Sequence, residues 1–409
     1  MPLRKKRTLR RAAALAALLL AGGLAAGWFR LRAALPDTFT LAPGQALTVG
    51  SLPFLQAGVP SAGPAAAAGS VQADTSRNQT LRLFGVVPVK TVRTVETPRR
   101  TVTVSGAPFG VKMFSDGALV VAFSDQYTAF GTENPAKEAG LRLGDLIVSA
   151  GGRPVRSNAE LSAVVTAAAG QPLPLTYLRD GVQHTTTLTP VADRDTGAWR
   201  AGVWVRDSSA GIGTLTFTDP ARGTFAGLGH AVSDSDTGAE LTLLSGEIVP
   251  VSILAVQKGT AGVPGELKGE FSGVALGAVR ANDTTGVYGT LTGAAPGGEA
   301  MPVANCQEVE VGEAEILTTL SGTTPRRYQV RIERVNLTAA DPNRNLLLRV
   351  TDERLLAEAG GIVQGMSGSP ILQNGRLVGA VTHVLINDPG CGYGIFAATM
   401  LEKADAAAG

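Results

Sequence analysis

Histidine is scarce in this 409-residue chain, so few side chains could act as a catalytic base. The three that occur are His184, His230 and His383. An imidazole ordinarily titrates near neutral pH, which suits it to accept a proton from a nucleophile. His230 follows a Gly-Leu-Gly run that lets backbone approach the ring closely, and we predict that it is the base. His383 lies in an apolar, strand-like run and His184 in a Thr-rich one, so we interpret them as a structural and a surface residue.

The strongest local motif, Gly-Met-Ser-Gly-Ser-Pro at 365–370, could supply the nucleophile. It resembles the nucleophile turn of chymotrypsin-type peptidases. A glycine two positions before the serine lets the chain curl, so that backbone N–H groups converge where the tetrahedral intermediate carries its negative charge. We therefore predict Ser367 as the nucleophile and the N–H groups of Gly365 and Ser367 as the oxyanion hole. Ser369, in the same turn, is the alternative nucleophile.

A catalytic serine also needs help from its neighbours. Its hydroxyl is a weak nucleophile unless a base takes the proton, and a buried carboxylate usually orients that base. Candidates for the carboxylate lie on both sides of the serine motif, and their spacing leaves all of them open: Asp234, Asp236, Asp283, Asp352 and Asp388.

The region 195–409, which must position these groups, has the pattern of a β-protein. Short apolar runs alternate with turns, and helical periodicity is slight until about 352–359. The 51 glycines and 23 prolines favour many short strands over long helices. We expect a mainly β fold, with a chymotrypsin-like peptidase domain of two packed β-barrels, or a sandwich, over these residues.

Charge and cysteine spacing argue against other classes. The formal net charge is +2, and no basic stripe with interleaved aromatic residues occurs, which disfavours a nucleic-acid-binding protein. The two cysteines, Cys306 and Cys391, lack the spacing of a metal site, and we expect neither a metal nor a cofactor. The sequence leaves open whether they form a disulfide or remain free thiols.

Residues 101–192 combine strand and helix signals in a compact pattern. Strands are expected over 111–114 and 119–123, on either side of a Ser-Asp-Gly turn. A capping box beginning at Ser157 opens a helix over 158–169. A hairpin with an Asp-Gly turn follows, because that dipeptide suits two consecutive positive φ angles.

Within this region, Ala-Gly-Leu-Arg-Leu-Gly-Asp-Leu-Ile at 139–147 resembles the corresponding motif of bacterial PDZ domains. The resemblance implies a domain that binds an extended peptide by adding it to an exposed sheet edge. The matching edge here would lie at Gly110, Val111 and Lys112, facing the predicted helix. A PDZ fold that acts only as a spacer is the alternative.

The N-terminus predicts attachment to a membrane. Six basic residues in the first eleven positions precede an uncharged run over 12–29, so we expect 1–32 to be a transmembrane signal anchor, with the rest of the chain extracytoplasmic. Small residues near Ala25 leave cleavage of a signal peptide open. Residues 33–100, rich in Pro, Gly and Ala, predict a tether with one or two strands over 81–95.

Several segments together resemble one family, the stage IV sporulation protein B peptidases. They are Gly-Leu-Gly-His-Ala-Val-Ser-Asp-Ser-Asp at 227–236, the glycine-rich run at 360–370, Gly-Ala-Val-Thr-His-Val at 379–384 and the stretch at 206–214. The order of anchor, PDZ domain and peptidase is similar too, and the resemblance covers roughly residues 80–400.

This resemblance implies a serine endopeptidase that cleaves itself and then a partner protein. The cleaved partner would trigger a signalling protease complex embedded in the neighbouring membrane, as in a sporulation checkpoint. By position, His230 is the base, Ser367 the nucleophile and Asp352 the acidic member. The PDZ domain would hold a peptide, either the chain's own N-terminal segment or the tail of a partner.

Two other classes of protein remain to be weighed. The first is a catalytically silent PDZ adaptor that regulates a membrane protease by binding alone; the favourable local contexts of His230 and Ser367 argue against it. The second is an esterase-like hydrolase, which would need a Gly-x-Ser-x-Gly elbow between alternating strands and helices, and this pattern is absent.

Overall fold

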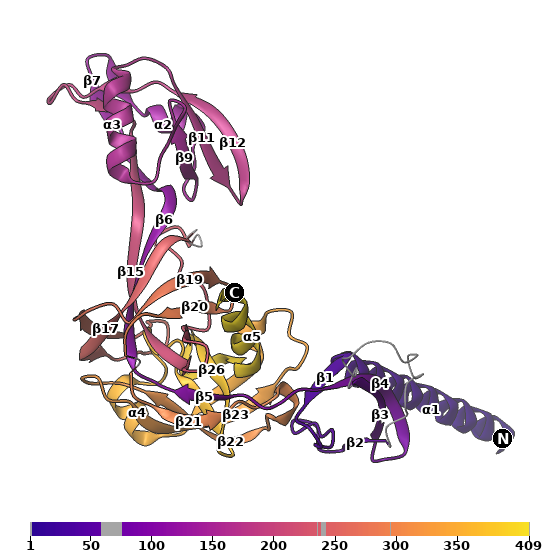
Figure 1. The fold of residues 1–409 in the computed structure, drawn as a ribbon. Coiled ribbons are helices and arrows are strands. Elements are labelled where there is room, and N and C mark those ends of the chain that lie inside the picture. Colours follow the sequence, from indigo (N-terminus) through magenta and orange to yellow (C-terminus); the bar gives the residue numbers. More distant parts are fainter. Residues whose placement is uncertain (1, 59–75, 235, 239–242, 295, 409) are drawn as a thin grey trace, which may run out of the picture.

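The computed structural model describes residues 2–58, 76–234, 236–238, 243–294 and 296–408. It is mainly β, as expected, and has three parts (Figure 1). A small N-terminal unit lies to one side of a two-part β-body. A third part, the predicted PDZ segment, stands away from that body at the end of two long strands.

The N-terminal unit is a folded unit where a tether was expected. Its four-stranded sheet has the order β1-β4-β3-β2 and encloses its own apolar core, which includes Leu35, Phe39, Leu81 and Val89. These side chains can be buried only if the segment folds back on itself, and this accounts for the difference. The alanine-rich part of the predicted tether lies largely outside the described residues. The elements of this unit are α1 (Pro2–Ala33), β1 (Thr38–Leu41), β2 (Leu55–Ala57), β3 (Ser76–Leu83) and β4 (Val87–Glu96).

The helix α1 includes the predicted anchor segment. Among the described residues, however, no helix has an apolar stretch long enough to cross a membrane. The transmembrane anchor is therefore not confirmed.

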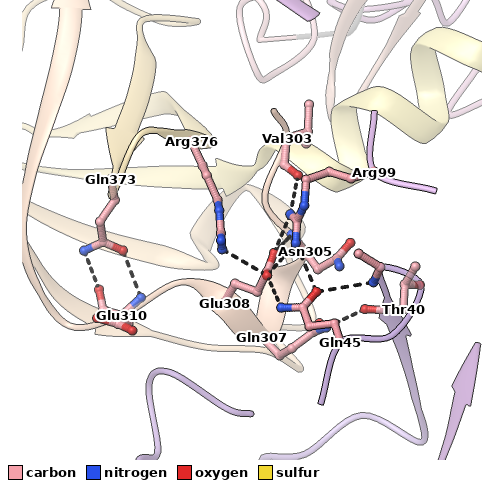
Figure 2. A network of polar contacts seen from close by, with 11 residues as sticks. Thr40, Gln45, Arg99, Val303, Asn305, Gln307, Glu308, Glu310, Gln373 and Arg376 are labelled. Atoms are coloured by element: carbon pink, nitrogen blue, oxygen red, sulfur yellow. Dashed lines mark hydrogen bonds and ion pairs between the residues drawn. The ribbon is translucent and has the colours of Figure 1, made fainter. Parts of the chain in front are cut away.

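The N-terminal unit is joined to the β-body by a buried polar network centred on Glu308 (Figure 2). Arg99 donates to both carboxylate oxygens at 2.7 Å, while Gln45 and Arg376 donate at 2.6 and 3.0 Å. Burial opposes ionisation of Glu308, but bonds from Arg99 and Gln45 outweigh it and lower its pKa to about 2. Gln307 also donates to the carbonyl oxygen of Thr40, which adds a second tie between the two parts.

The PDZ segment is built around the ends of the two long strands, β6 and β15, that lie away from the β-body. These upper ends are 119–123 of β6 and 203–206 of β15, which pair with each other. Its core includes Leu141, Ile147, Leu161 and Leu175. Ser157 caps α3 by accepting a bond from the N–H of Glu160, as predicted. The elements are β6 (Pro108–Phe123), β7 (Gln126–Thr128), β8 (Gly131–Glu133), α2 (Pro135–Glu138), β9 (Leu146–Ala150), β10 (Arg153–Pro154), α3 (Asn158–Ala168), β11 (Leu173–Arg179), β12 (Val182–Leu188), β13 (Val191–Ala192), β14 (Trp199–Arg200) and β15 (Val203–Asp219).

The predicted turn between 111–114 and 119–123 is wrong, because β6 runs through it as one strand of 16 residues. Its lower half pairs with the lower half of β15 and with β17 inside the β-body. The PDZ segment is thus an insertion in the first sheet of the body rather than a domain that precedes it. The remaining elements of that sheet are β5 (Thr101–Val104), β16 (Thr224–Gly227), β17 (Leu243–Gln257), β18 (Glu266–Phe271), β19 (Gly277–Asp283), β20 (Gly286–Leu291) and β21 (Glu299–Pro302).

The second half of the body is a closed barrel, in the order β22-β23-β24-β27-β26-β25. The prediction of two barrels is thus confirmed only in part. One barrel is closed, and the first sheet beside it stays open because it continues into the PDZ segment. The barrel and its flanking helices are η1 (Cys306–Glu308), β22 (Gly312–Thr318), β23 (Arg326–Val335), η2 (Pro342–Arg344), β24 (Leu346–Val350), α4 (Glu353–Ala359), β25 (Pro370–Gln373), β26 (Arg376–Leu385), β27 (Asp388–Phe396) and α5 (Ala397–Ala408).

Candidate active site

The loop that carries Ser367 joins α4 to β25 and is fixed by the neighbouring sheet. Thr214, on the lower half of β15, donates its Oγ1 to the carbonyl oxygen of Gly365 and its N–H to that of Ser367, both at 2.9 Å. Two positions on, the Oγ1 of Thr216 donates to the carbonyl oxygen of Gly368 at 2.7 Å. The nucleophile loop of the barrel is therefore held by a strand of the first sheet, and the site lies between the two halves of the body.

The loop that carries His230 follows β16, and its backbone packs closely against the serine loop and β26. A Cβ on Gly368 would come within 2.5 Å of the N atom of Leu228, and one on Gly229 within 3.0 Å of Cγ2 of Thr382. Leu228 and Gly229 both have positive φ, 66° and 73°, which turns the chain sharply just before the histidine. These close approaches need the glycines that the sequence supplies, and through them the loop of His230 lies against the loop of Ser367.

The side chains of the two residues are not yet engaged with each other. The Oγ of Ser367 donates to the carbonyl oxygen of Thr382 at 2.7 Å. Nδ1 of His230 lies 2.8 Å from the carbonyl oxygen of Ala231, so this nitrogen carries the proton and Nε2 has a free lone pair. The imidazole is thus in the tautomer that a general base requires, while the serine hydroxyl is turned aside.

His383 lies against His230 and is part of the site rather than a remote wall residue. The ring centroids are 4.9 Å apart with planes tilted by 32°. Partial burial and the neighbouring His230 lower the pKa of His383 to about 4, against the opposing effect of Asp341. Burial also lowers the pKa of His230, although its bond to Ala231 acts the other way. Both rings are therefore neutral at neutral pH.

Asp352 lies elsewhere and has other partners. Its carboxylate caps α4, accepting bonds from the N–H groups of Arg354 and Leu355, and it also accepts from the guanidinium of Arg354 and the N–H of Gln329. The Arg354 side chain is the main reason that the pKa of Asp352 falls to about 2. The carboxylate makes no bond with His230. The role as acidic member implied by the family resemblance is therefore not supported by the geometry, because helix capping already uses the carboxylate.

The other carboxylates also serve local structure. Asp234 is fully buried and accepts from Arg206 and Thr237, Asp236 pairs with Arg206 at 2.6 Å, and Asp283 pairs with Lys403 at 3.0 Å. Asp388, exposed, lies 3.5 Å from Arg349. Among the described residues, none of the five candidate aspartates forms a hydrogen bond to His230, and a backbone carbonyl takes the orienting position instead.

The geometry around Gly365 suits an oxyanion hole. Gly365 has φ of 95°, so the chain curls there as expected. Within the described part of the chain, the N–H groups of Gly365 and Ser367 have no acceptor. They remain available to a negatively charged oxygen. Ser369, in contrast, is fully buried, which places its hydroxyl out of reach of a polypeptide substrate.

Sequence reasoning missed the contacts that hold the site together. Thr214, Thr216 and Thr382 act through hydroxyls or backbone groups, and Ala231 acts through its carbonyl oxygen alone. A threonine in a strand is common, and a backbone carbonyl has no signature in sequence. The alternation of threonines at 214, 216 and 218 is a signal that the sequence does contain.

The predicted peptide-binding edge of the PDZ segment is wrong. Gly110, Val111 and Lys112 pair on one side with β15 and on the other with β17, so no open edge exists there. The inserted position of the segment explains this, because it draws the start of β6 into the first sheet. The strand beside α3 is instead the upper end of β15, which pairs with β6 over 203–206.

A cavity of about 630 Å³ separates this upper end of β15 from α3. Its wall includes Leu161, Ser162 and Val165 from α3, and Val203 and Val205 from β15. A groove between a helix and a strand edge is the form that strand-addition sites take.

The third histidine and the two cysteines have separate surroundings. His184 stacks on Tyr177 with centroids 5.4 Å apart in the PDZ segment. Cys306 and Cys391 are free thiols. Over the described residues, no group of three or more His, Cys, Asp or Glu side chains could hold a metal ion.

Comparison with known proteins agrees with this architecture. Residues 197–401, half of the chain, match the family SpoIVB peptidase S55, and residues 110–189 match the PDZ domain. The chain belongs to the SpoIVB peptidase S55 family. The resemblance first noted in the sequence is thereby confirmed.

Individual relatives share shorter stretches. A protein of Haemophilus influenzae, described as a periplasmic serine protease of the Do/HhoA-like kind, is 37% identical over 89 residues, 20% of this chain and 19% of the relative. One of Bartonella henselae, described as a zinc metalloprotease, is 36% identical over 104 residues, 25% and 28% of the two chains. The chain thus spans well under a third of either relative. The Rv3671c protease of M. tuberculosis, in its active form, is 16% identical, covers 49% of this chain and 75% of its own, and has a TM-score of 0.29.

Proposed function

We propose that this S55-family protein is an extracytoplasmic serine endopeptidase with Ser367 as nucleophile and His230 as general base. The observation that supports the proposal is the close approach of two glycine-rich loops. One loop carries Ser367 and N–H groups that are free among the described residues, and the other carries His230 with Nε2 available. Membership of a peptidase family supports the same assignment.

The chemistry would proceed by acyl transfer. The Ser367 hydroxyl turns from the carbonyl of Thr382 to Nε2 of His230, gives up its proton and attacks the carbonyl carbon of a peptide bond. The N–H groups of Gly365 and Ser367 stabilise the oxyanion. His230 then donates the proton to the departing amine, leaving an acyl-enzyme. In the second half of the reaction, His230 takes a proton from water, which attacks the acyl-enzyme, and returns the proton to Ser367. The bond from Nδ1 to Ala231 keeps Nε2 available throughout.

We infer that substrates are protein segments in extended form, including a segment of the chain itself and an exposed segment of a partner in a proteolytic signalling cascade. A membrane-embedded protease complex would be the partner that receives the signal. The PDZ segment supports this reading because the cavity beside β15 can accept an extended peptide. A similar protein described as periplasmic supports the extracytoplasmic location, and the N-terminal helix would hold the protein at a membrane.

The test follows the mass of the purified full chain over time, alone and with added unfolded casein. Wild type and Ser369→Ala should produce fragments, whereas Ser367→Ala and His230→Ala should stay intact and leave casein uncleaved. Fragments from Ser367→Ala at the wild-type rate would refute the assignment.

One observation favours a second function, that of a silent PDZ adaptor. The Ser367 hydroxyl is bonded to a backbone carbonyl, and no carboxylate supports His230 among the described residues. Intact mass and uncut casein for all variants, together with peptide binding at the PDZ segment, would establish the adaptor.

A further inference from the structure

The turn between β3 and β4 in the N-terminal unit presents apolar side chains to solvent. Phe84 is 69% exposed, Val86 72% and Val87 48%. Among the described residues, the ring of Phe84 has one aromatic neighbour, Phe54, with the ring centroids 6.2 Å apart. We call Phe84, Val86 and Val87 the apolar tip. Such a cluster on a short turn has no role in the core of the unit, so it points to contact with something outside the chain.

The backbone at this tip makes the phenylalanine more unusual still. Phe84 and Gly85 have φ of 49° and 74°, the pair of positive values found in the tightest hairpin turns. Two other hairpin turns of the chain have the same pattern, at Asp180-Gly181 and Asn374-Gly375. Those two use the residues that tolerate positive φ, whereas the β3–β4 turn carries a bulky aromatic residue there. A side chain that is unfavourable both for its backbone and for water marks a functional position.

The β3–β4 hairpin lies beside α1, and its tip points toward the N-terminal end of that helix. Lys90 of β4 donates to the carbonyl oxygen of Leu35, just after the helix, and pairs with Asp37 at 2.8 Å. Nearer the tip, the carbonyl oxygen of Pro88 accepts a bond from Nε1 of Trp28 at 3.3 Å, two helical turns earlier in α1. From Lys90 to Pro88, toward the tip, the contacts of β4 move from Leu35 to Trp28, so the hairpin runs alongside the helix (β3, β4 and α1 in Figure 1).

The neighbouring stretch of α1 is also apolar and uncovered. Leu19, Leu20, Leu24 and Phe29 are between 64% and 70% exposed. Basic groups border it: Arg32 lies 5.5 Å from the ring of Trp28, and Arg82 donates to the carbonyl of Val86. Exposed leucines with tryptophan and arginine at their border are typical of segments that lie at the surface of a bilayer.

Charge supplies the complementary argument. The first 96 residues hold twelve of the 36 basic residues but three of the 34 acidic ones, so the N-terminal unit is strongly basic and the rest of the chain is acidic. A bilayer with anionic headgroups would attract this unit and repel the remainder.

We propose that the apolar tip of the β3–β4 hairpin inserts into the interface of an anionic lipid bilayer beside α1, so that the N-terminal unit is a second membrane contact. Because Arg99 and Glu308 fix this unit to the β-body, the insertion would also set the orientation of the catalytic body relative to the membrane. The proposal relies on the membrane association suggested above, but its test reads lipid contact, and casein cleavage is measured separately.

The experiment uses the full chain with a single environment-sensitive dye, attached at Val86→Cys or, as a control, at Val274→Cys. Val274 is 86% exposed in the loop between β18 and β19. The unsubstituted chain corrects for labelling of Cys306 and Cys391. Each protein is mixed with vesicles of phosphatidylcholine and phosphatidylglycerol, and with vesicles of phosphatidylcholine alone.

At position 86 we expect a blue shift of emission and quenching by spin-labelled lipid, stronger with phosphatidylglycerol, and no response at position 274. Adding Phe84→Asn to the position-86 protein should weaken the response severalfold. It should also leave the melting temperature unchanged or higher, because asparagine suits the positive φ. A loss of response with a lowered melting temperature would instead point to misfolding, and the dye on Val87→Cys then decides the matter.

A dye at position 86 as exposed as one at 274 in both kinds of vesicle would overturn the proposal. So would shielding of position 86 in solution without vesicles, which would indicate a protein partner such as a second copy. If casein is still cleaved in either case, the membrane contact has failed while the proposed function stands.

Discussion

The two ends of strand β15 lie in different surroundings. At the lower end, every residue from Gly213 to Asp219 is buried, and Thr214 and Thr216 bond three carbonyl oxygens of the Ser367 loop. At the upper end no residue from Val203 to Ile212 is buried, and 203–206 pairs with β6 alone. One continuous strand thus belongs to a buried core bonded to the Ser367 loop at one end, and to the border of a cavity at the other.

This difference separates two tasks along one element. The buried and hydrogen-bonded backbone of 213–219 resists displacement. The lower end of β15 should therefore determine how well Ser367 is positioned. The upper end has an unpaired edge and should respond to a bound peptide. Substitutions at the lower end should therefore change the rate of cleavage, while those at the upper end should change peptide binding.

The largest effect is expected from separating the lower end from the serine loop. In Gly368→Ala the new Cβ would lie 2.0 Å from the carbonyl oxygen of Thr214, at a residue with φ of 92°. Displacement of the loop at a cost of about 3 kcal/mol should lower kcat/KM by roughly 100-fold. Cleavage of casein measures the change.

Gly375→Ala is the matched control, since Gly375 also has positive φ but its Cβ would meet open space. It should lose about 1 kcal/mol of unfolding free energy and keep its activity. Equal activity of the two variants would show that the contact between β15 and the loop is dispensable.

The second prediction concerns His383, which extends the lower-end site. In His383→Ala water reaches the ring of His230, so the pKa of His230 should rise toward its ordinary value of about 6.5. The acid limb of kcat/KM against pH then moves to higher pH, and kcat falls by about tenfold as the ring loses its support. His383→Phe, which keeps a ring in place, should restore most of the rate.

A pH profile of His383→Ala that superimposes on that of wild type would mean that His383 has no influence on the base. A loss in His383→Phe as large as in His383→Ala would assign the effect to a nitrogen atom of the ring instead of its bulk.

At the upper end, Ser162→Trp should fill the cavity beside β15 without touching the strand. Affinity for extended peptides should fall by about tenfold, while basal casein cleavage stays within about twofold of wild type. Ala163→Trp adds the same bulk on α3 outside the residues that line the cavity, and serves as control. Fluorescence anisotropy of labelled peptides measures both. Unchanged binding in Ser162→Trp would locate the peptide elsewhere.

The smallest effect on activity is expected at Asp352, which tests how far the catalytic site extends. Its pKa of about 2 lies below the ordinary 3.8, so the carboxylate stabilises the fold above pH 3.8 and loses this contribution as pH falls toward 2. Asp352→Asn should therefore lower the unfolding free energy at neutral pH by about 2 kcal/mol and leave kcat/KM within about threefold. Denaturant titration and casein cleavage separate the two.

Glu353→Gln, at the exposed neighbouring position, should change neither quantity. A large loss of kcat/KM in Asp352→Asn with unchanged stability would instead return Asp352 to the catalytic site.

Sequence was informative where a local pattern demanded a local geometry. Gly229 before His230, and Gly365 and Gly368 around Ser367, have positive φ values. Ser157 caps its helix as expected, although the Glu160 side chain accepts from the N–H of Arg156, so the second half of the capping box does not form. The resemblance to a family gave the architecture. Prediction failed where a group has a role that no motif records. The carboxylate of Asp352 caps its own helix, and the partner of His230 is the carbonyl oxygen of Ala231, an atom that every residue has.

The edge at Gly110 to Lys112 failed for a related reason. Its residues have the pattern of a strand and do form one, but the pattern alone does not say which neighbours a strand will pair with. The tether prediction shows the same limit, because sparse apolar residues in a Pro- and Gly-rich segment still assembled into a core once β3 and β4 paired.

The insertion of the PDZ segment between β6 and β15 also bears on how the chain folds. Phe114 and Ser208 pair directly although the whole PDZ segment separates them in sequence, so bringing them together from an open chain would carry a large loop-closure entropy. A PDZ segment that folds first would hold the two strand starts side by side, as the turn of a hairpin does. Pairing of β6 with β15 could then extend from the PDZ segment into the first sheet. The loop of Ser367, which is bonded to Thr214 at the far end of this pairing, would be the last part to become ordered.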